Sequence, residues 1–178
     1  VNHPQKDSYS SKASCQTFLI PERYQQDINE PPMSDTHIHT SGDGSHTVWS
    51  DRFRQYYHNP NGAVSESRHV FFDTPDLAGR LSGKRTFEIF EMGFGTGLNL
   101  LVLAALIREM DELPAITFRS VELSPLNPDQ AGQLNHAHQL GLPDADRLMD
   151  RIFGHRESGL NVIEITPHLT LERYIGPF

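Results

Sequence analysis

The sequence has little cysteine and no long hydrophobic run. Cys15 is the only cysteine among 178 residues, so a disulfide framework and a cluster of thiolate metal ligands are both excluded. No stretch of 18 or more apolar residues occurs, which argues against a transmembrane helix. The first twelve residues are polar and lack the apolar centre of a secretory signal peptide. We therefore expect a cytoplasmic protein with no membrane partner.

Positive charge is also in short supply. Lys and Arg number 15 against 23 Asp and Glu, which gives a formal net charge of −8 and a pI near 5.6. This balance argues against broad, salt-driven binding of nucleic acid, which depends on clustered cations. A local basic patch stays open, although a solvated surface is the commoner explanation for such residues. Its members would be Arg52, Arg54, Arg80, Lys84 and Arg85.

The first part of the chain, residues 1–42, shows no sustained hydrophobic periodicity and is rich in Ser, Pro, Gln and Asp. This composition predicts a flexible N-terminal arm. Met33 follows "NEPP" and is a candidate natural start. His37 and His39 have the spacing of a metal-ligand pair, but no further ligands accompany them, so we predict no metal site. The folded domain is expected over residues 43–178.

From residue 43 onwards the pattern predicts an α/β domain. Residues 86–92 and 115–123 read as buried strands, and the apolar helix predicted between them, 98–113, ends at Pro114. The order strand, helix, strand favours a parallel sheet. The other expected elements are a short strand in "RHVFF", a turn or short helix in "TPDLAGRLSG", helices over 129–141 and 145–154, and strands over 160–166 and 169–175. A doubly wound sheet normally has more strands, so we expect an incomplete fold.

The glycine-rich segment after the first strand is the strongest functional signal. A phosphate-binding P-loop is excluded because no lysine follows Gly97. The dinucleotide fingerprint needs a glycine where Leu98 stands, which weakens the assignment of a dehydrogenase. The arrangement that remains is an acid followed by alternating glycines: Glu91, Gly93, Gly95 and Gly97.

S-adenosylmethionine suits this arrangement better than a dinucleotide does. It has no pyrophosphate, and it carries a cationic ammonium and sulfonium that a carboxylate at a strand end would attract. Glycines let the backbone approach a ligand because they have no Cβ atom. Glu122, at the end of the next predicted strand, can accept the ribose hydroxyls. A glycine loop alone is often only tight packing, but the loop and both acids in this order favour S-adenosylmethionine.

The same segment closely resembles a narrower family signature. "EMGFGTGLN" is similar to the E-x-GFGTGLN motif of the tRNA wobble-uridine methyltransferases that form 5-methylaminomethyl-2-thiouridine. These enzymes occur alone or as the N-terminal half of a bifunctional protein with a flavin-dependent oxidase. "DGSHT", "YYHNPNGAVSESRHVFF", "SVELSPL" and "ITPHLTLERY" resemble the same family, so the likeness runs from about Asp43 to the end.

This resemblance implies a Rossmann-like, S-adenosylmethionine-dependent methyltransferase fold over residues 43–178, incomplete at its C-terminus. It implies methyl transfer to the amine of 5-aminomethyl-2-thiouridine in the anticodon loop of tRNA. It also implies that Glu122 contacts the ribose and that Glu66 lies near the cofactor, although a buried or capping carboxylate would explain Glu66 equally well. The other implied cofactor contacts are Glu91, Gly93, Gly95, Thr96, Gly97 and Asn99.

The chain departs from the family at its C-terminal end. In the family, a strand end of the form D-x-F-x-P follows "ITPHLTLERY", and the sequence stops at Phe178 before reaching it. The catalytic aspartate is therefore expected beyond Phe178, and no catalytic residue is assigned. Trp49, Tyr56 and Tyr57 could stack on bases or belong to the core. The alternatives are a non-catalytic, cofactor-binding remnant, a methyltransferase acting on a small molecule or a protein, and, as the weakest, a dehydrogenase.

Overall fold

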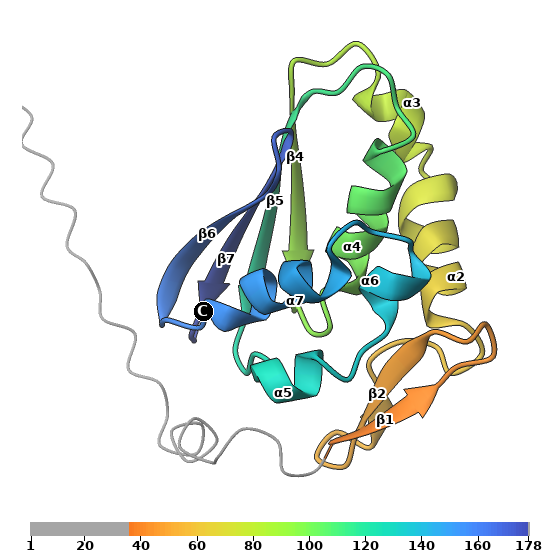
Figure 1. Cartoon of the computed structure of the whole chain (residues 1–178), viewed down its shortest axis with the longest axis vertical. Helices are drawn as coiled ribbons and strands as arrows, with labels where there is room; N and C mark the ends of the chain where they lie inside the picture. The colour runs from red at the N-terminus through yellow and green to blue at the C-terminus, as the bar shows by residue number, and fades with distance from the viewer. Residues whose placement is uncertain (1–35, 178) are drawn as a thin grey trace, which may run out of the picture. The chain divides into compact units, whose positions relative to one another are not determined.

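The computed structural model describes residues 36–177, and these form two sheets and a group of helices (Figure 1). The first sheet is antiparallel and consists of β1 (Thr36–Thr40), β2 (His46–Ser50) and β3 (Gln55–Tyr56). The prediction of a flexible arm was wrong for residues 36–42, because β1 pairs with β2 along its whole length. Most side chains of β1 are exposed, so the strand is held by backbone pairing that hydrophobic periodicity does not reveal. The rest of the arm, with Cys15 and Met33, lies outside the described residues.

Three short helical segments follow this sheet. They are α2 (Ala63–Ser67), a π-helical turn η1 (Arg68–Asp73) and α3 (Leu77–Leu81). The strand predicted in "RHVFF" is therefore wrong. Phe72 alone of these residues is buried, while Val70 and Phe71 stay exposed. Packing of one residue per turn against the neighbouring helices overrides the β-propensity of this run.

The second sheet has four strands in the order β4-β5-β7-β6. The strands are β4 (Thr86–Met92), β5 (Ala115–Glu122), β6 (Gly159–Thr166) and β7 (Leu169–Ile175). β4 and β7 both run parallel to β5, and only β6 is antiparallel to its neighbour. The expected α/β class and the parallel core are thus confirmed. β4 pairs with β5 alone, so one edge of β4 has no strand partner among the described residues.

The helices that connect these strands are α4 (Leu98–Ile107), α5 (Pro128–Ala131), α6 (His136–Gln139) and α7 (Ala145–Gly154). α7 matches its predicted bounds, but α4 ends before the predicted residue 113. The helix predicted over 129–141 is wrong as a single element, because it divides into α5 and α6. Asn127 and Gln130 form a capping box that starts α5, and the C-cap at Gly132 ends it after one turn.

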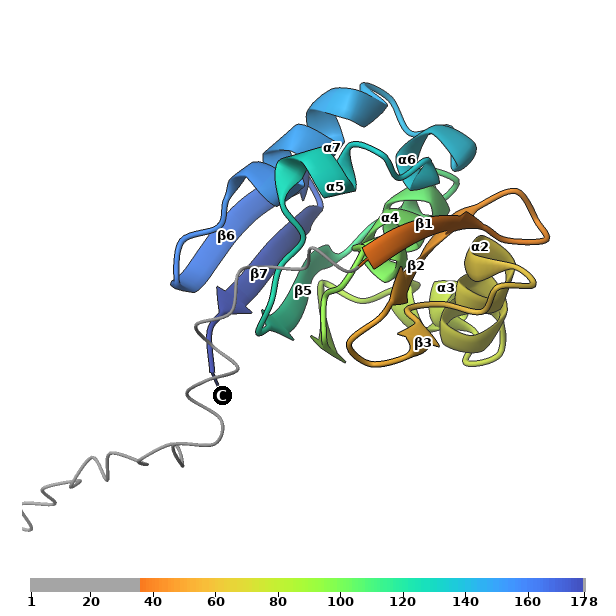
Figure 2. The same ribbon diagram turned by 90° about the horizontal axis from the view of Figure 1, so that it is seen from below.

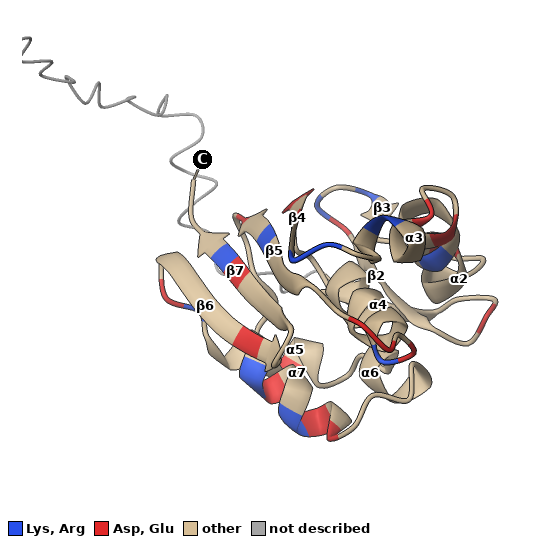
Figure 3. Cartoon of the chain, turned by 90° about the horizontal axis from the view of Figure 1, so that it is seen from above, with Lys and Arg blue, Asp and Glu red and all other residues tan. Residues whose placement is uncertain are grey.

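The helices cover only one face of the four-stranded sheet (Figures 2 and 3). On this covered face lie Phe118 and Leu171, both buried, and α4 packs there with apolar residues on all its sides. The opposite face carries apolar side chains that are between 39% and 72% exposed. We call it the bare face; its exposed apolar residues are Phe90, Met92, Leu160, Val162 and Tyr174. No helix of the described chain is long and apolar enough to cross a membrane.

Candidate cofactor site

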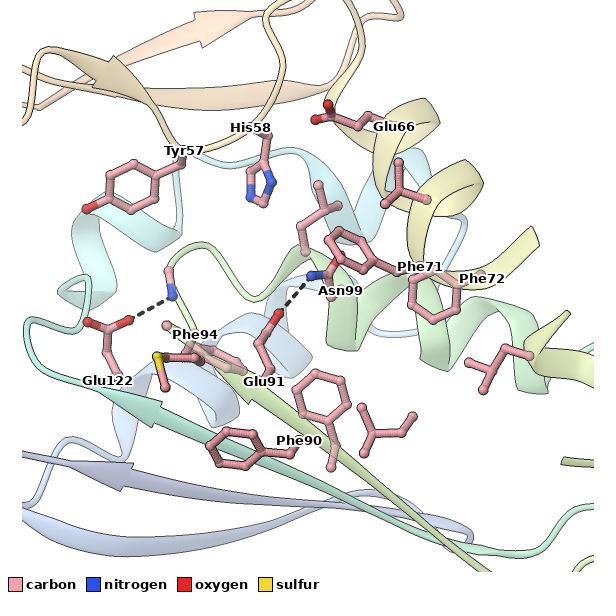
Figure 4. Close-up of a pocket in the computed structure, with 18 of the residues that line it drawn as sticks. Tyr57, His58, Glu66, Phe71, Phe72, Phe90, Glu91, Phe94, Asn99 and Glu122 are labelled. Atoms are coloured by element: carbon pink, nitrogen blue, oxygen red, sulfur yellow. Dashed lines mark hydrogen bonds between the residues drawn. The ribbon is translucent and has the colours of Figure 1, made fainter. Parts of the chain in front are cut away.

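The glycine loop connects the end of β4 to the start of α4. Gly93, Gly95 and Gly97 all have positive φ angles, of 82°, 53° and 69°, and Gly97 is the N-cap of α4. Residues with a Cβ rarely adopt such angles, so the alternation of glycines follows from the backbone path. At Gly95 a Cβ would also lie 3.3 Å from Cδ2 of Tyr57. The ring of Tyr57 therefore packs directly against the loop (Figure 4).

Glu91 is the penultimate residue of β4, and its carboxylate is turned toward the covered side. The amide of Asn99 donates to Oε1 at 2.7 Å, and the hydroxyl of Ser120 lies 3.5 Å from Oε2. Ser67 in turn donates to the side-chain oxygen of Asn99 at 2.5 Å, so a chain of hydrogen bonds joins α2, α4 and β4. Burial raises the pKa of Glu91 to about 7, against the opposing effect of these hydrogen bonds.

Glu122 ends β5 and faces the same loop. Its carboxylate accepts the backbone N–H of Gly95 and the backbone N–H of Ser124, each at 2.8 Å. The two predicted strand-end acids thus lie on either side of the glycine loop (Figure 4). Burial raises the pKa of Tyr57, and the negative charge of Glu122 adds to this rise.

Two of the predicted cofactor contacts lie behind the loop surface. Thr96 is fully buried, and its hydroxyl is 2.7 Å from Nε2 of His58. Burial lowers the pKa of His58 to about 4, so this histidine is neutral near pH 7. Gly97 is also buried, and a Cβ there would lie 3.0 Å from the ring of Phe94. Thr96 and Gly97 therefore shape the loop from inside and do not line the cavity in front of it.

Glu66 lies on α2 at the rim of the cavity. Its carboxylate accepts two hydrogen bonds from Asn59, one from the backbone N–H at 3.0 Å and one from the side-chain amide at 3.3 Å. Glu66 therefore secures the "NPNG" turn and also faces the cavity. The structure brings Glu66 to the same cavity as the glycine loop, although the loop begins more than 25 residues after Glu66 in the sequence.

The cavity has a volume of about 1080 Å³ and two chemically different ends. At the loop end, six predicted site residues line it: Glu66, Glu91, Gly93, Gly95, Asn99 and Glu122. The other end runs along β4 to η1 and α3 and is lined by aromatic and aliphatic side chains, including Phe71, Phe72 and Phe87. A concave site with an apolar wall and few polar groups is typical for small ligands.

Sequence reasoning did not identify the parts played by Ser67, Tyr57 and His58. All three come from the segment before β4, and no local motif links them to the glycine loop. The five residues of the possible basic patch are all exposed. Among residues 36–177, no group of three or more His, Cys, Asp or Glu side chains is placed to hold a metal ion. His37 instead forms a 2.9 Å hydrogen bond with Asp51.

Comparison with known proteins gives sequence matches to curated proteins of tRNA modification. The tRNA 5-methylaminomethyl-2-thiouridine biosynthesis bifunctional protein MnmC of Ralstonia nicotianae is 39% identical over 95 residues, which are 52% of this chain and 14% of that protein. The protein of the same name from Burkholderia thailandensis is 36% identical over 107 residues, or 60% of this chain and 16% of that protein. The chain thus spans about one sixth or less of the length of these curated relatives. No protein-family model matches it.

Comparison of folds gives a related result. The crystal structure of MnmC2 from Aquifex aeolicus aligns with a TM-score of 0.60 and 21% sequence identity, covering 89% of this chain and 50% of that chain. The two proteins therefore share a fold over nearly all of the present chain. The sequence matches to MnmC over about half of the chain, together with this shared fold, support an MnmC methyltransferase-like family for this chain.

Proposed function

We propose that the loop end of the cavity binds S-adenosylmethionine, and that the chain carries the cofactor half of a tRNA methyltransferase site. The substrate would be the primary amine of 5-aminomethyl-2-thiouridine at the wobble position of tRNA. The names of the curated relatives support the tRNA substrate, because they are proteins of 5-methylaminomethyl-2-thiouridine biosynthesis. The observation that carries the cofactor proposal is the pair Glu91 and Glu122 on either side of the glycine loop.

The residues at the loop end fit the chemical groups of S-adenosylmethionine. When bound, this cofactor supplies the methyl group. The buried carboxylate of Glu91 would attract a cationic ligand and would be held ionised by it, since a nearby positive charge lowers a carboxyl pKa. Glu122 already has its carboxylate fixed by two backbone N–H groups, and free lone pairs remain to accept hydroxyls. Open space in front of Gly93 lets a ligand approach the backbone closely.

The other walls of the cavity would position the substrate and exclude water. Tyr57 covers Gly95, while Phe71 and Phe90 lie on the apolar side. An amine must lose its proton before it can accept a methyl group, so a low-dielectric wall that disfavours the ammonium form assists the reaction. Holding the amine in line with the transferred group would account for most of the rate.

Calorimetric titration with S-adenosylmethionine tests the cofactor proposal. We expect saturable binding to the unaltered chain and a loss of at least about tenfold in affinity in Gly95→Val, because that side chain meets Tyr57 at the loop. Gly83→Val is the matched control: Gly83 also has a positive φ, of 67°, but a Cβ there meets nothing within 4 Å and the residue does not line the cavity. Equal binding by both variants would contradict the assignment of the loop.

Transfer of a labelled methyl group to tRNA that lacks the modification tests the second half of the proposal. Incorporation that stops when the target amine is absent would identify the substrate. Binding of the cofactor without any transfer would instead favour a cofactor-binding protein that does not catalyse methylation by itself. Transfer to a small-molecule amine but not to tRNA would favour a different substrate class.

A further inference from the structure

A group of aromatic rings lies on the three-stranded sheet, next to the cavity. The strand register places His37, Trp49 and Tyr56 directly across from one another on β1, β2 and β3, and His39 follows on the same face. The ring centroids of Trp49 and Tyr56 are 4.8 Å apart, and those of His39 and Tyr56 are 5.1 Å apart. We call these four residues the aromatic shelf. They line a hollow of about 290 Å³.

The shelf is accessible and its ring edges are held in place. His37 and His39 are exposed, and Trp49 and Tyr56 are half-buried. Asp51 accepts a 2.7 Å hydrogen bond from the indole N–H of Trp49 and pairs with His37 at 2.9 Å. These hydrogen bonds, with the cross-strand packing, restrict the rotamers of Trp49 and His37. Ordered rings on an open hollow lose little conformational entropy when a flat ligand stacks on them.

The shelf is continuous with the proposed methyltransferase site. Tyr56 lines both the hollow of the shelf and the large cavity, and its neighbour Tyr57 packs on Gly95 of the glycine loop. Phe53 also lines the large cavity and is 58% exposed. A substrate whose reacting group entered the cavity would therefore place its adjoining parts on the shelf.

Two positively charged side chains lie beside the shelf, although the chain is acidic overall. The turn between β2 and β3 carries Arg52 and Arg54, both exposed, and the Arg52 guanidinium lies 5.3 Å from the centroid of the Phe53 ring. Arginines that flank aromatic rings match the combination of phosphates and bases in single-stranded nucleic acid. A duplex would present only its backbone to such a surface, since its bases are stacked on one another.

From this arrangement we propose that the aromatic shelf binds unpaired nucleobases of an RNA loop, with Arg52 and Arg54 at the phosphates. The assignment of RNA rests on the proposed function, because the same chemistry would serve any single strand. Stacking on Trp49 or Tyr56 would position the nucleotides next to the one whose base enters the cavity. The shelf would thus hold the substrate, while the glycine loop holds the cofactor.

Trp49 is the only tryptophan in the chain, so its fluorescence reports on the shelf alone. The experiment titrates the chain with an unmodified RNA stem-loop that has seven unpaired loop nucleotides, and with a fully paired RNA of equal length. We expect saturable quenching of Trp49 by the stem-loop and little quenching by the duplex. Tyr56→Leu should weaken the binding about 5- to 150-fold, the range for loss of one stacked base. Tyr174→Leu on the bare face is the matched control and should leave it unchanged.

Several results would overturn the proposal. Equal quenching by duplex and stem-loop would show that the RNA binds through its charged phosphates and that its bases do not stack on the shelf. An unchanged Trp49 signal during RNA binding measured by anisotropy would place the RNA elsewhere. A blue-shifted Trp49 emission that RNA does not alter would show that polypeptide covers the shelf. Calorimetry with S-adenosylmethionine on the same samples separates the two proposals. If the cofactor binds but RNA does not change the Trp49 fluorescence, the proposal for the shelf is wrong and the proposal for the cofactor site stands.

Discussion

The two faces of the four-stranded sheet have the same kind of side chains but opposite surroundings. Phe118 on the covered face is 2% exposed, whereas Phe90 on the neighbouring strand is 64% exposed on the bare face. Next to Phe90, the charged residue Glu91 points to the covered side and is largely buried. On β4, therefore, a phenyl ring is in solvent and a carboxylate is inside. Apolar character alone does not show which face of this sheet forms the core.

The covered face contributes to the stability of the fold, whereas the bare face is available for association with other molecules. The covered face joins the helices in one continuous core, and α4 contributes eight of its ten residues to it. The bare face adds nothing to that core, and its exposed apolar side chains lie on β4, β7 and β6, with β5 and its Arg119 between β4 and β7. Exposed apolar side chains gathered on one face are typical of an interaction site. The buried titratable groups all lie on the side of the helices, so the pH dependence should originate there too.

The largest expected effect comes from removing matched phenyl rings on the two faces. Phe118→Ala should lower the free energy of unfolding by about 3–5 kcal/mol, because it leaves a cavity in a packed core. Phe90→Ala removes a ring that is already mostly in water and should cost less than about 1 kcal/mol. Urea denaturation followed by circular dichroism measures both. Similar losses in the two variants would mean that the bare face is covered in solution.

The next effect concerns the buried carboxyl of Glu91. Its pKa in the folded chain, about 7, lies above the ordinary value of 4.5, so the folded state binds the proton more tightly than the unfolded state does. This contribution to stability is full below pH 4.5 and is lost as the pH rises toward and through 7. Glu91→Gln should therefore flatten the decline in unfolding free energy between pH 5 and pH 7.5. A decline of the same slope in the variant would assign it to another group.

His136 should give a pH dependence of opposite sign. This buried histidine on α6 has no hydrogen-bond partner within the described chain for either ring nitrogen, and burial lowers its pKa to about 3. The unfolded chain then binds the proton more tightly, so stability is lost as the pH falls below 6.5. His136→Leu should reduce that loss in denaturation measured at pH 6.5 and at pH 4.5. His58, with a pKa of about 4, would keep part of it.

The smallest effect is expected for the charges of the bare face. Arg119 forms ion pairs with Glu88 at 2.8 Å and with Glu172 at 2.7 Å, and these side chains are in contact with solvent. Exposed ion pairs contribute little, and salt screens them. Arg119→Gln should change the urea midpoint by little more than the error of the measurement, and less again in 0.5 M NaCl. A large change that persists in salt would contradict the description of this face as solvated.

The sequence predicted the elements with strong periodicity and clear ends. β4 has the bounds that its alternation indicated, and α7 agrees as well, since glycine and proline mark the chain on either side of these elements. The failures have physical causes. β1 is held by backbone pairing with few buried side chains, and "RHVFF" is helical because the surrounding helices bury Phe72. Neither cause can be read from local propensity.

The residues of the candidate site also divide into those that the sequence could predict and those that it could not. Glu91 and Glu122 could be predicted because the ends of adjacent parallel strands meet at one edge of a sheet. The loop glycines could be predicted because their positive φ angles need that residue type. Ser67, Tyr57 and His58 could not, because they reach the loop from an earlier segment whose position depends on long-range packing. The contact of the strand-end acids and the loop with a cofactor stays a prediction.

The free edge of β4 affects how this protein behaves at high concentration. Within residues 36–177, β4 pairs with β5 alone, so its other side presents a row of backbone N–H and C=O groups that can pair with an extended chain. Here that edge borders Phe90 and Met92, which are more than 60% exposed. Edge and apolar surface together favour aggregation, and a charged substitution such as Met92→Lys should reduce it.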